Sequence, residues 1–495
     1  MRLQRVIASA AISVGSAALG FLAAIIVHAA GLDTLAASVA AALVVAAAYS
    51  VRPVDGLLGF GLLVLFTGTV AFWTGVDVRL ADEIGVLLLV VTTLAVHRDR
   101  LAVPRPGWRE AALATFFAAG IVSSLVQAVP AQVWMLGLAL LAKTFVFLYL
   151  VMSLRVTPDE VRRTSTVALS VALVVLGVGL VELLAPDVAT GALGAIPFDR
   201  RRGPIEVVNS WFTHPALYGW LAAFVSLFLI ARFAVLRRTW ALVLGLLLGG
   251  AAIISGRRTP VIGILFSVGV GALHQVLSRR VSWRTWAAIG AGALLVAIVS
   301  VSVMGQFYAK TFEDYFGRPT RIMEVFEENP RSRPIMRLHP RVALYAGSVA
   351  IARDEFPLGV GIGRYGSHMS RQEYSPVYER YKLHRVFGLR QRRPIAVTDT
   401  FWPMVLGETG FVGFAGAIGF FALLGRDLWR AAVPGDSPEA TAFTLGALMV
   451  FAEALSRSAA AQVFLAPPIA YWVFGAVGLA LALRGAAADE GAAAG

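Results

Sequence analysis

Three arginines and one aspartate have the residue types and positions best suited to chemistry on an anionic ligand. Arg257 and Arg258 form a pair in a short polar hairpin between two apolar runs. Arg341 and Asp399 lie in a long polar stretch at 304–400, and Asp399 stands where the next apolar run begins. Guanidinium groups stay protonated and bind phosphate oxygens in pairs of hydrogen bonds. A carboxylate within reach of a hydroxyl group can accept its proton.

Each of these residues also has a purely structural interpretation. Asp399 directly precedes Thr400 and the start of an apolar run, a position favoured for the N-cap of a helix. Arg258 would serve equally well as an anchor to lipid phosphate at the membrane boundary. Arg341 is one of many charges in its polar stretch, followed by an apolar spacing that indicates an amphipathic helix. The residues alone leave both interpretations open.

The elements that must position these residues are apolar helices. The chain is 58% hydrophobic and 15% charged, with a mean hydropathy of +0.74. Runs of about 18 or more apolar residues recur, and each is long enough to cross a hydrocarbon core about 30 Å thick. We therefore expect an all-α polytopic membrane protein with about 12–14 transmembrane helices. The candidate spans are 7–29, 34–50, 56–75, 81–96, 110–129, 132–153, 165–185, 214–235, 240–255, 260–277, 285–303, 401–424, 441–457 and 463–483.

These spans divide the chain into four parts. Residues 1–303 and 401–484 hold the transmembrane helices, 304–400 forms a helical loop subdomain, and 485–495 is a disordered tail. Arginines gather in alternate loops, which by the positive-inside rule are cytoplasmic. Both termini are then expected inside, and the 304–400 loop outside. Arg257 and Arg258 break this bias in an outer hairpin, which an anionic ligand on that face would explain.

Composition also excludes several classes of function. The chain has no cysteine, which excludes disulfides, thiolate catalysis and cysteine-ligated metals. No convincing cluster of metal ligands is present, so we expect no metal and no cofactor. A net charge of +13 would suggest nucleic acid in a soluble protein. Here it indicates membrane topology and contact with anionic lipid, and we expect no nucleic-acid partner.

Other conspicuous residues have structural interpretations of at least equal weight. His214 before Pro215 is more typical of the start of a helix than of a catalytic base. Lys143 lies inside an expected span, where it either is functional or pairs with another group. The glycines at 359–366 do not follow a strand, so a tight turn between loop helices is expected rather than a dinucleotide site. Tyrosines at 374–381 suit either sugar stacking or packing.

Four segments, in order, resemble the O-antigen ligase and polymerase superfamily of bacterial inner-membrane enzymes. They are RRGPIEVVNSWFTHPALYGWLAAF (201–224), ISGRRTPVIGI (254–264), RVALYAGSVAIARDEFPLGVGIGRYG (341–366) and TDTFWPMVLGETGFVGF (398–414). Ala216 stands where that family usually has asparagine. Counting back from Gly410 and Gly413 places Asp399 at the position of the histidine in the ligase signature. The resemblance covers about 200–425, and acidic residues can precede the same glycines in the polymerase branch.

The resemblance implies a glycosyltransferase that uses an undecaprenyl-diphosphate-linked glycan at the periplasmic face and a sugar or lipid acceptor. The acceptor hydroxyl would attack the anomeric carbon directly, with inversion and without a metal. Asp399, Arg341 and Arg258 would be catalytic, and the substrate-binding residues would be Arg257, Arg202, His214, Tyr345 and Arg364. A transporter or flippase of lipid-linked glycans, or a non-catalytic scaffold of envelope assembly, remains the alternative.

Overall fold

The computed structural model describes residues 2–102, 106–197, 201–202, 205–278, 283–316, 339–433 and 437–493. It confirms an all-α polytopic membrane protein. Among the described residues, 11 helices are long and apolar enough to cross a membrane, and Thr239–Ile254 and Ile469–Gly485 are shorter apolar helices. Each of the fourteen expected spans forms a helix, although the 16-residue helix at Ala81–Val96 is short for a crossing.

The helices before the loop subdomain are α1 (Arg2–Ala29), α2 (Thr34–Val51), α3 (Pro53–Thr74), α4 (Ala81–Val96), the short η1 (Arg98–Arg100), α5 (Trp108–Val126), α6 (Ala131–Met152), α7 (Pro158–Leu184), α8 (Pro186–Gly191), α9 (Pro215–Leu236), α10 (Thr239–Ile254), α11 (Thr259–Leu277) and α12 (Trp283–Phe316). A two-stranded antiparallel ladder, β1 (Arg201–Arg202) with β2 (Ile205–Glu206), precedes α9. The remaining helices are α14 (Pro340–Asp354), α15 (His368–Gln372), α16 (Val377–Arg380), η3 (Leu383–Arg385), α17 (Trp402–Ala431), α18 (Pro438–Ser458) and α19 (Ile469–Ala493).

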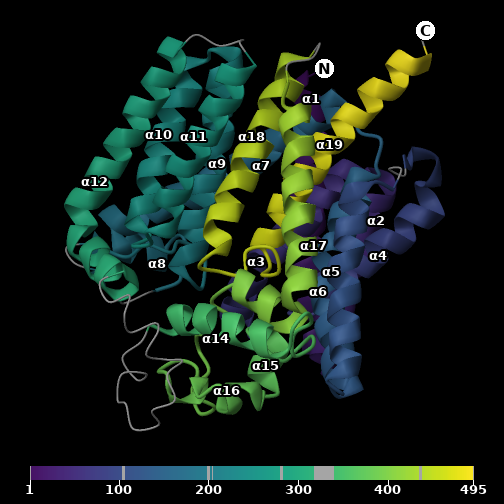
Figure 1. The fold of residues 1–495 in the computed structure, drawn as a ribbon. Helices are drawn as coiled ribbons and strands as arrows, with labels where there is room; N and C mark the ends of the chain where they lie inside the picture. Colours follow the sequence, from purple (N-terminus) through teal and green to yellow (C-terminus); the bar gives the residue numbers. More distant parts are fainter. Residues whose placement is uncertain are drawn as a thin grey trace.

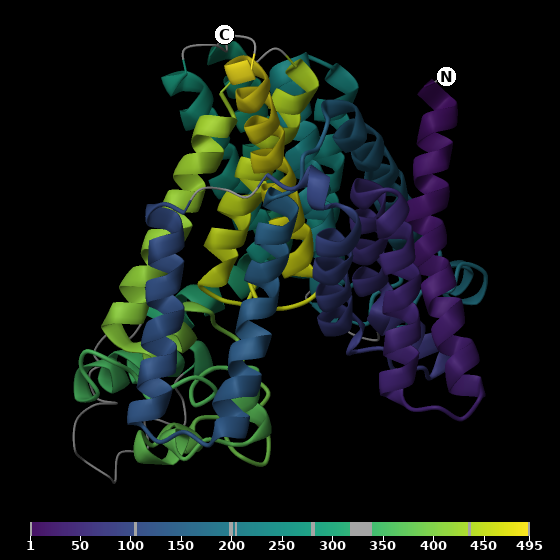
Figure 2. The same ribbon diagram turned by 90° about the vertical axis from the view of Figure 1, so that its right-hand side faces the viewer.

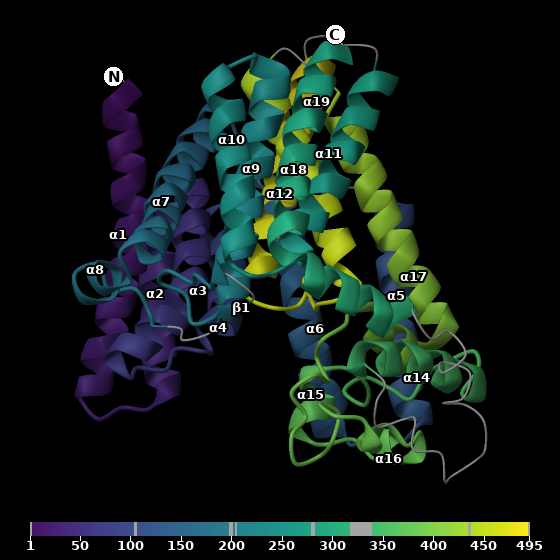
Figure 3. The same cartoon turned by 90° about the vertical axis from the view of Figure 1, so that its left-hand side faces the viewer.

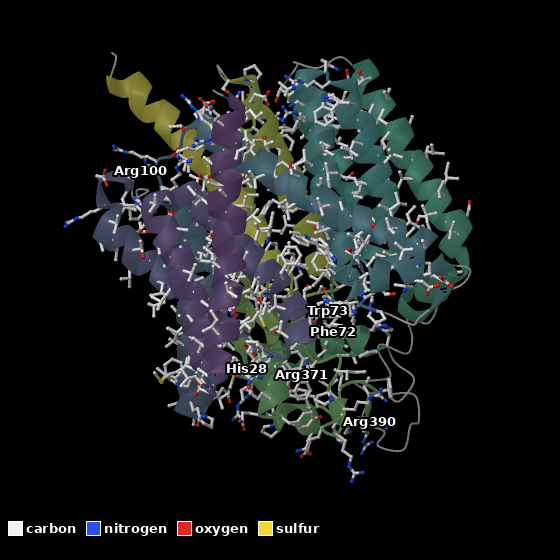
Figure 4. All side chains as sticks on the ribbon, turned by 180° about the vertical axis from the view of Figure 1, so that it is seen from behind. His28, Phe72, Trp73, Arg100, Arg371 and Arg390 are labelled. Atoms are coloured by element: carbon white, nitrogen blue, oxygen red, sulfur yellow. The ribbon has the colours of Figure 1, made fainter. Side chains whose placement is uncertain are left out.

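The two ends of the bundle differ in what they carry. Both termini lie at one end, here called the termini end, and α14, α15 and α16 lie at the other, called the loop end (Figure 1). Phe72 and Trp73, in the last turn of α3, are 49% and 52% exposed and lie on the side of the bundle nearer the loop-end residue Arg390 (Figure 4). Exposed aromatic residues at this level are typical of a membrane–water boundary. The loop subdomain therefore lies beyond the helix bundle.

Two expected boundaries differ from the structure. The border expected at 304 falls inside α12, which continues as one helix to Phe316. The tail expected to be disordered from 485 is helical as far as Ala493, because α19 continues beyond its apolar segment. Hydropathy marks where a helix stops being apolar, and not where it ends. Residues 317–338 of the expected loop subdomain lie outside the described residues.

Two helices extend from the bundle to support the loop subdomain. The ends of α5 and α6 run alongside it (Figure 2). Ile362 packs against Gly120 of α5 and Gly137 of α6, where an added Cβ would lie within 3.0 Å of its side chain. The stretch that holds Ile362 connects α14 to α15, and Gly361, Gly363 and Gly366 adopt positive φ values there. The expected turn between loop helices is thus confirmed, and it is fixed on both sides by packing.

Helix α17 is broken where the glycine-rich stretch meets it. Gly410 has φ 65° and ψ −164°, outside the helical region. The amide of Val360 donates to the carbonyl of Gly407 at 2.9 Å, and the amide of Gly361 donates to Glu408 at 3.0 Å. Backbone groups left unpaired at membrane depth are costly, so these bonds explain how the break is tolerated. Two of the segments that carry the family resemblance therefore pack directly on each other.

The tyrosines of the loop subdomain pack its interior. Tyr378 is fully buried, and its ring stacks on Tyr365 and Tyr374 with centroids 5.7 and 5.2 Å apart. Its hydroxyl accepts a hydrogen bond from the amide of Gly366 at 2.8 Å. Tyr381 donates to the carboxylate of Asp354 at 2.9 Å. Of the two interpretations of these tyrosines, packing is the one that the structure supports.

Candidate active site

Arg341 and Asp399 form an ion pair where the loop subdomain joins the bundle. The Nε atom of Arg341 lies 3.4 Å from Oδ2 of Asp399, and the side chains are 28% and 35% exposed. Arg341 occupies the first turn of α14, whose N-cap residue His339 accepts a hydrogen bond from the Arg341 amide. Asp399 lies in the turn before α17, where its own amide donates to Ala396. The pair is thus held between two helix starts.

Asp399 does not cap α17, so that interpretation is wrong. The N-cap residue is Phe401, two positions later, and it makes no side-chain cap hydrogen bond. The amide of Phe401 instead donates to the carbonyl of Ser458 at 3.3 Å, and the indole of Trp402 donates to the hydroxyl of Ser458 at 2.8 Å. The start of α17 is therefore fixed by the end of α18. Asp399 is left to face Arg341.

Burial decides the acidity of Asp399. Desolvation raises the pKa of its carboxyl above the ordinary value, and this outweighs the opposing effect of the Arg341 and Arg257 charges. Burial disfavours the charged form of an acid, and a neighbouring cation favours it. The result is a carboxylate that is a stronger base than an exposed aspartate. A raised pKa at a partly exposed, paired carboxylate is typical of functional sites.

Two further predicted residues approach this pair from the bundle. Arg257, in the turn between α10 and α11, is close enough for its charge to act on Asp399. Its Nη2 atom lies 2.8 Å from Nε2 of His214. His214 is the N-cap of α9, and its Nδ1 atom lies 3.2 Å from the Ala216 amide. The chain thus brings Arg341, Asp399, Arg257 and His214 together, with His214 in the structural role expected for it.

The other predicted residues have contacts of their own. Arg258 follows Arg257 and is the N-cap residue of α11, without a side-chain cap hydrogen bond. Tyr345 donates to the carbonyl of Ala459 at 2.9 Å and so ties α14 to the end of α18. Arg202 pairs through its backbone with Ile205, and its side chain lies outside the described structure. The backbone amide of Arg364 donates a hydrogen bond to the carboxylate of buried Glu408.

Sequence reasoning missed a buried ion pair beneath the site. Arg457 donates to Glu453 at 3.1 Å, and these side chains are 5% and 2% exposed. Both belong to the last turns of α18, the helix end that accepts hydrogen bonds from Phe401 and Tyr345. Glu453 also lies against Gly263 of α11. Two opposite charges four residues apart inside an apolar run would have revealed this pair.

Lys143 belongs to a second, separate charged cluster. It contacts Asp82 at 2.6 Å and also Glu83, and the hydroxyl of Tyr471 donates to Asp82 at 3.1 Å. Asp82 and Glu83 begin α4, so the cluster joins α4, α6 and α19. Pairing is thus the interpretation of Lys143 that the structure supports.

Within the described residues, no group of three or more histidine, cysteine, aspartate or glutamate side chains could hold a metal ion. No known protein family and no curated protein matches this chain. The site combines a carboxyl group of raised pKa with the guanidinium groups of Arg341 and Arg257, where the loop subdomain joins the bundle.

Proposed function

We propose that the protein transfers a glycan from an undecaprenyl-diphosphate carrier to a sugar or lipid hydroxyl, at the periplasmic face of a bacterial inner membrane. The observation that carries this proposal is the Arg341–Asp399 pair at 3.4 Å, beside the charge of Arg257. It combines a cation for a phosphate with a base for a hydroxyl at the level where a lipid diphosphate would lie. The loop end is then the periplasmic end.

The reaction follows from this arrangement. The acceptor oxygen attacks the anomeric carbon as its proton passes to the carboxylate of Asp399. The bond between the anomeric carbon and the diphosphate oxygen breaks, and its electron pair stays on the diphosphate. Arg341, Arg257 and Arg258 hold that developing charge, since guanidinium groups suit phosphate oxygens. A direct attack inverts the anomeric centre. Stabilising charge where it develops is commonly the largest contribution to catalysis.

The test is release of undecaprenyl diphosphate from a lipid-linked oligosaccharide by purified protein in liposomes. Native protein is compared with Asp399→Asn and Arg341→Ala, and with Arg371→Ala as the control. Arg371 is exposed on α15 at the loop end (Figure 4) and takes no part in the Arg341–Asp399 pair. We expect both site variants to lose roughly 10²–10³-fold in rate, and the control to keep the native rate.

Two outcomes would contradict the proposal. Equal release by all four proteins would remove Asp399 and Arg341 from the mechanism. Movement of the intact lipid-linked glycan between leaflets, without any release of diphosphate, would favour a transporter. The same liposomes report both outcomes, because the position and the chemical state of the glycan are measured separately.

A further inference from the structure

An apolar cavity of about 200 Å³ lies far from the candidate active site, in the half of the bundle nearer the termini end. Helices α3, α6, α7, α9, α18 and α19 line it, with side chains such as Leu57, Phe147, Val225, Phe443 and Leu479. The wall contributed by α7 includes exposed Thr166 and half-buried Leu169. The cavity therefore opens on the outer surface of the bundle, which faces lipid.

One end of this cavity is polar and cationic. Arg162, Arg232 and Glu439 line it. Arg232 lies 3.2 Å from Glu439, and Arg238 lies 3.9 Å from the same carboxylate. Arg162 lies 3.1 Å from Asp159. Of the charged residues that line the mouth, Arg162 and Arg232 are cations and Glu439 is an anion, which leaves one positive charge.

Arg232 also has an unsatisfied donor there. Its Nε atom is buried and makes no hydrogen bond with any described residue. Because this donor is buried, an anionic oxygen at the mouth can reach only the part of the Arg232 side chain that remains exposed, which is 28% of it. The net charge of the mouth therefore indicates an anion, whereas the remaining wall indicates a hydrocarbon chain.

The length of the cavity is close to the depth of one leaflet. Along α19 it extends from Tyr471 to Leu483, which is roughly 18 Å at the helical rise. Half of the hydrocarbon core is about 15 Å, so the cavity matches the chain of a lipid in one leaflet. The charged mouth also belongs to the ends of α7, α9 and α18 at the termini end.

We infer that this cavity is a binding site for an anionic phospholipid, with part of one acyl chain inside and the phosphate against Arg232 and Arg162. The lipid would join α7, which packs with α1 and α3, to the central helices α9, α18 and α19. In Figure 3, α7 lies between α1 on one side and α9 and α10 on the other. The inference does not depend on the proposed transferase activity, because the two sites lie at different ends of the bundle.

The chain offers a variant that fills the cavity without touching its charges. Gly475 of α19 lines the wall, and an added Cβ there would lie 3.6 Å from Phe147, an ordinary contact distance. Gly475→Leu should therefore occupy the space of the acyl chain. The double variant Arg162→Gln/Arg232→Gln instead removes the cations. Arg426→Gln is the control, since Arg426 pairs with Asp427 and does not line the cavity.

The experiment measures lipid retention by native mass spectrometry and thermal unfolding in detergent, with phosphatidylglycerol or phosphatidylcholine added back to delipidated protein. We expect native protein and Arg426→Gln to retain one phosphatidylglycerol and to melt at a higher temperature with it than with phosphatidylcholine. The double variant should bind phosphatidylglycerol roughly thirtyfold more weakly. Gly475→Leu should stay folded without lipid and lose the response to it.

Three results would overturn the inference. They are retention by Gly475→Leu equal to that of native protein, equal binding of the anionic and zwitterionic lipids, and co-purification of a polyprenyl phosphate in place of the phospholipid. Since Gly475→Leu leaves every ion pair intact, loss of folding in the double variant would still leave a decisive comparison.

Discussion

At the scale of single residues, the base strength of Asp399 is set by a balance between burial and nearby cations. Burial raises its pKa, and the charge of Arg341 lowers it. A general base acts in its ionised form and works best when its pKa approaches the working pH. The proposed reaction therefore needs Asp399 to be ionised but not strongly stabilised as an anion. The charge of Arg341 favours the ionised form of the Asp399 carboxyl group, and partial burial disfavours it.

This balance predicts the pH dependence of activity. Glycan release should rise with pH as Asp399 ionises, with its midpoint above the ordinary aspartate value of about 3.9. Arg341→Ala removes the cation that lowers this pKa, so the midpoint should move to higher pH in addition to the loss of rate. Arg341→Lys keeps the charge and should leave the midpoint close to native. The measurement is the initial rate of diphosphate release against pH, and an identical midpoint in all three proteins would contradict the assignment.

A second prediction at this scale concerns the buried pair Glu453–Arg457. Removing one partner of a buried ion pair leaves an uncompensated charge and typically costs about 3–5 kcal/mol. Arg457→Met should therefore lower the thermal unfolding temperature in detergent more than the double variant Glu453→Gln/Arg457→Met, which leaves no charge behind. The comparison is made by intrinsic fluorescence during heating. A double variant less stable than Arg457→Met would show that the pair does not act as a unit.

At the scale of elements, the break in α17 and the stretch 357–361 depend on each other. An added Cβ at Gly410 would lie 2.2 Å from the carbonyl carbon of Leu358, and at Gly359 it would lie 2.3 Å from the carbonyl oxygen of Gly407. Both neighbours are backbone atoms, which cannot turn away as a side chain would. Gly410 also has a positive φ that side chains rarely adopt. The two segments therefore pack backbone against backbone, and only glycine fits at Gly359 and Gly410. This contact is called the α17 joint.

This joint gives a direct prediction for stability. Gly410→Ala and Gly359→Ala should each destabilise the protein by at least about 1–3 kcal/mol, the usual cost of overpacking. Gly250→Ala is the control, because nothing lies within 4 Å of a Cβ added there in α10. Within a helix, alanine is favoured over glycine, so the control should be neutral or stabilising. Thermal unfolding in one detergent compares the three, and equal unfolding temperatures would contradict the close approach.

The sequence predicts the helices well and the joints between them poorly, for a physical reason. Hydropathy is local, so every apolar run at or near spanning length, from α1 to α19, could be recognised from its own residues. The contact of Phe401 with Ser458 joins residues far apart in the chain. No local pattern reveals it, and for that reason the interpretation of Asp399 as the cap of α17 is wrong. The family resemblance named Arg341 and Asp399 as residues of one site, but their ion pair could not be predicted from the sequence.

At the scale of the whole molecule, every interpretation of the site depends on orientation. The two termini share one end, and α14–α16 occupy the other (Figure 1). The proposed transferase requires the loop end to face the periplasm, where polymerisation of a surface glycan would take place. The phospholipid cavity requires the termini end to face a leaflet that contains anionic lipid. Charge bias in the connecting loops predicts the same orientation. A single measurement of sidedness therefore bears on both proposals.

The absence of cysteine from the native chain makes this measurement simple. Single-cysteine variants His28→Cys and Arg371→Cys place a thiol at the loop end, and Arg100→Cys places one at the termini end (Figure 4). His28 and Arg371 are exposed, and the Arg100 side chain is 41% exposed, so each thiol can be reached by solvent. A membrane-impermeant maleimide should label the first two variants in cells with a permeabilised outer membrane. It should label Arg100→Cys only after the inner membrane is disrupted. The native chain, which carries no thiol, gives the background.

Labelling of Arg100→Cys in intact inner membranes, with His28→Cys and Arg371→Cys protected, would place the Arg341–Asp399 pair in the cytoplasm. A periplasmic glycan transferase would then be excluded, because its lipid-linked donor would lie on the opposite side of the membrane from its base.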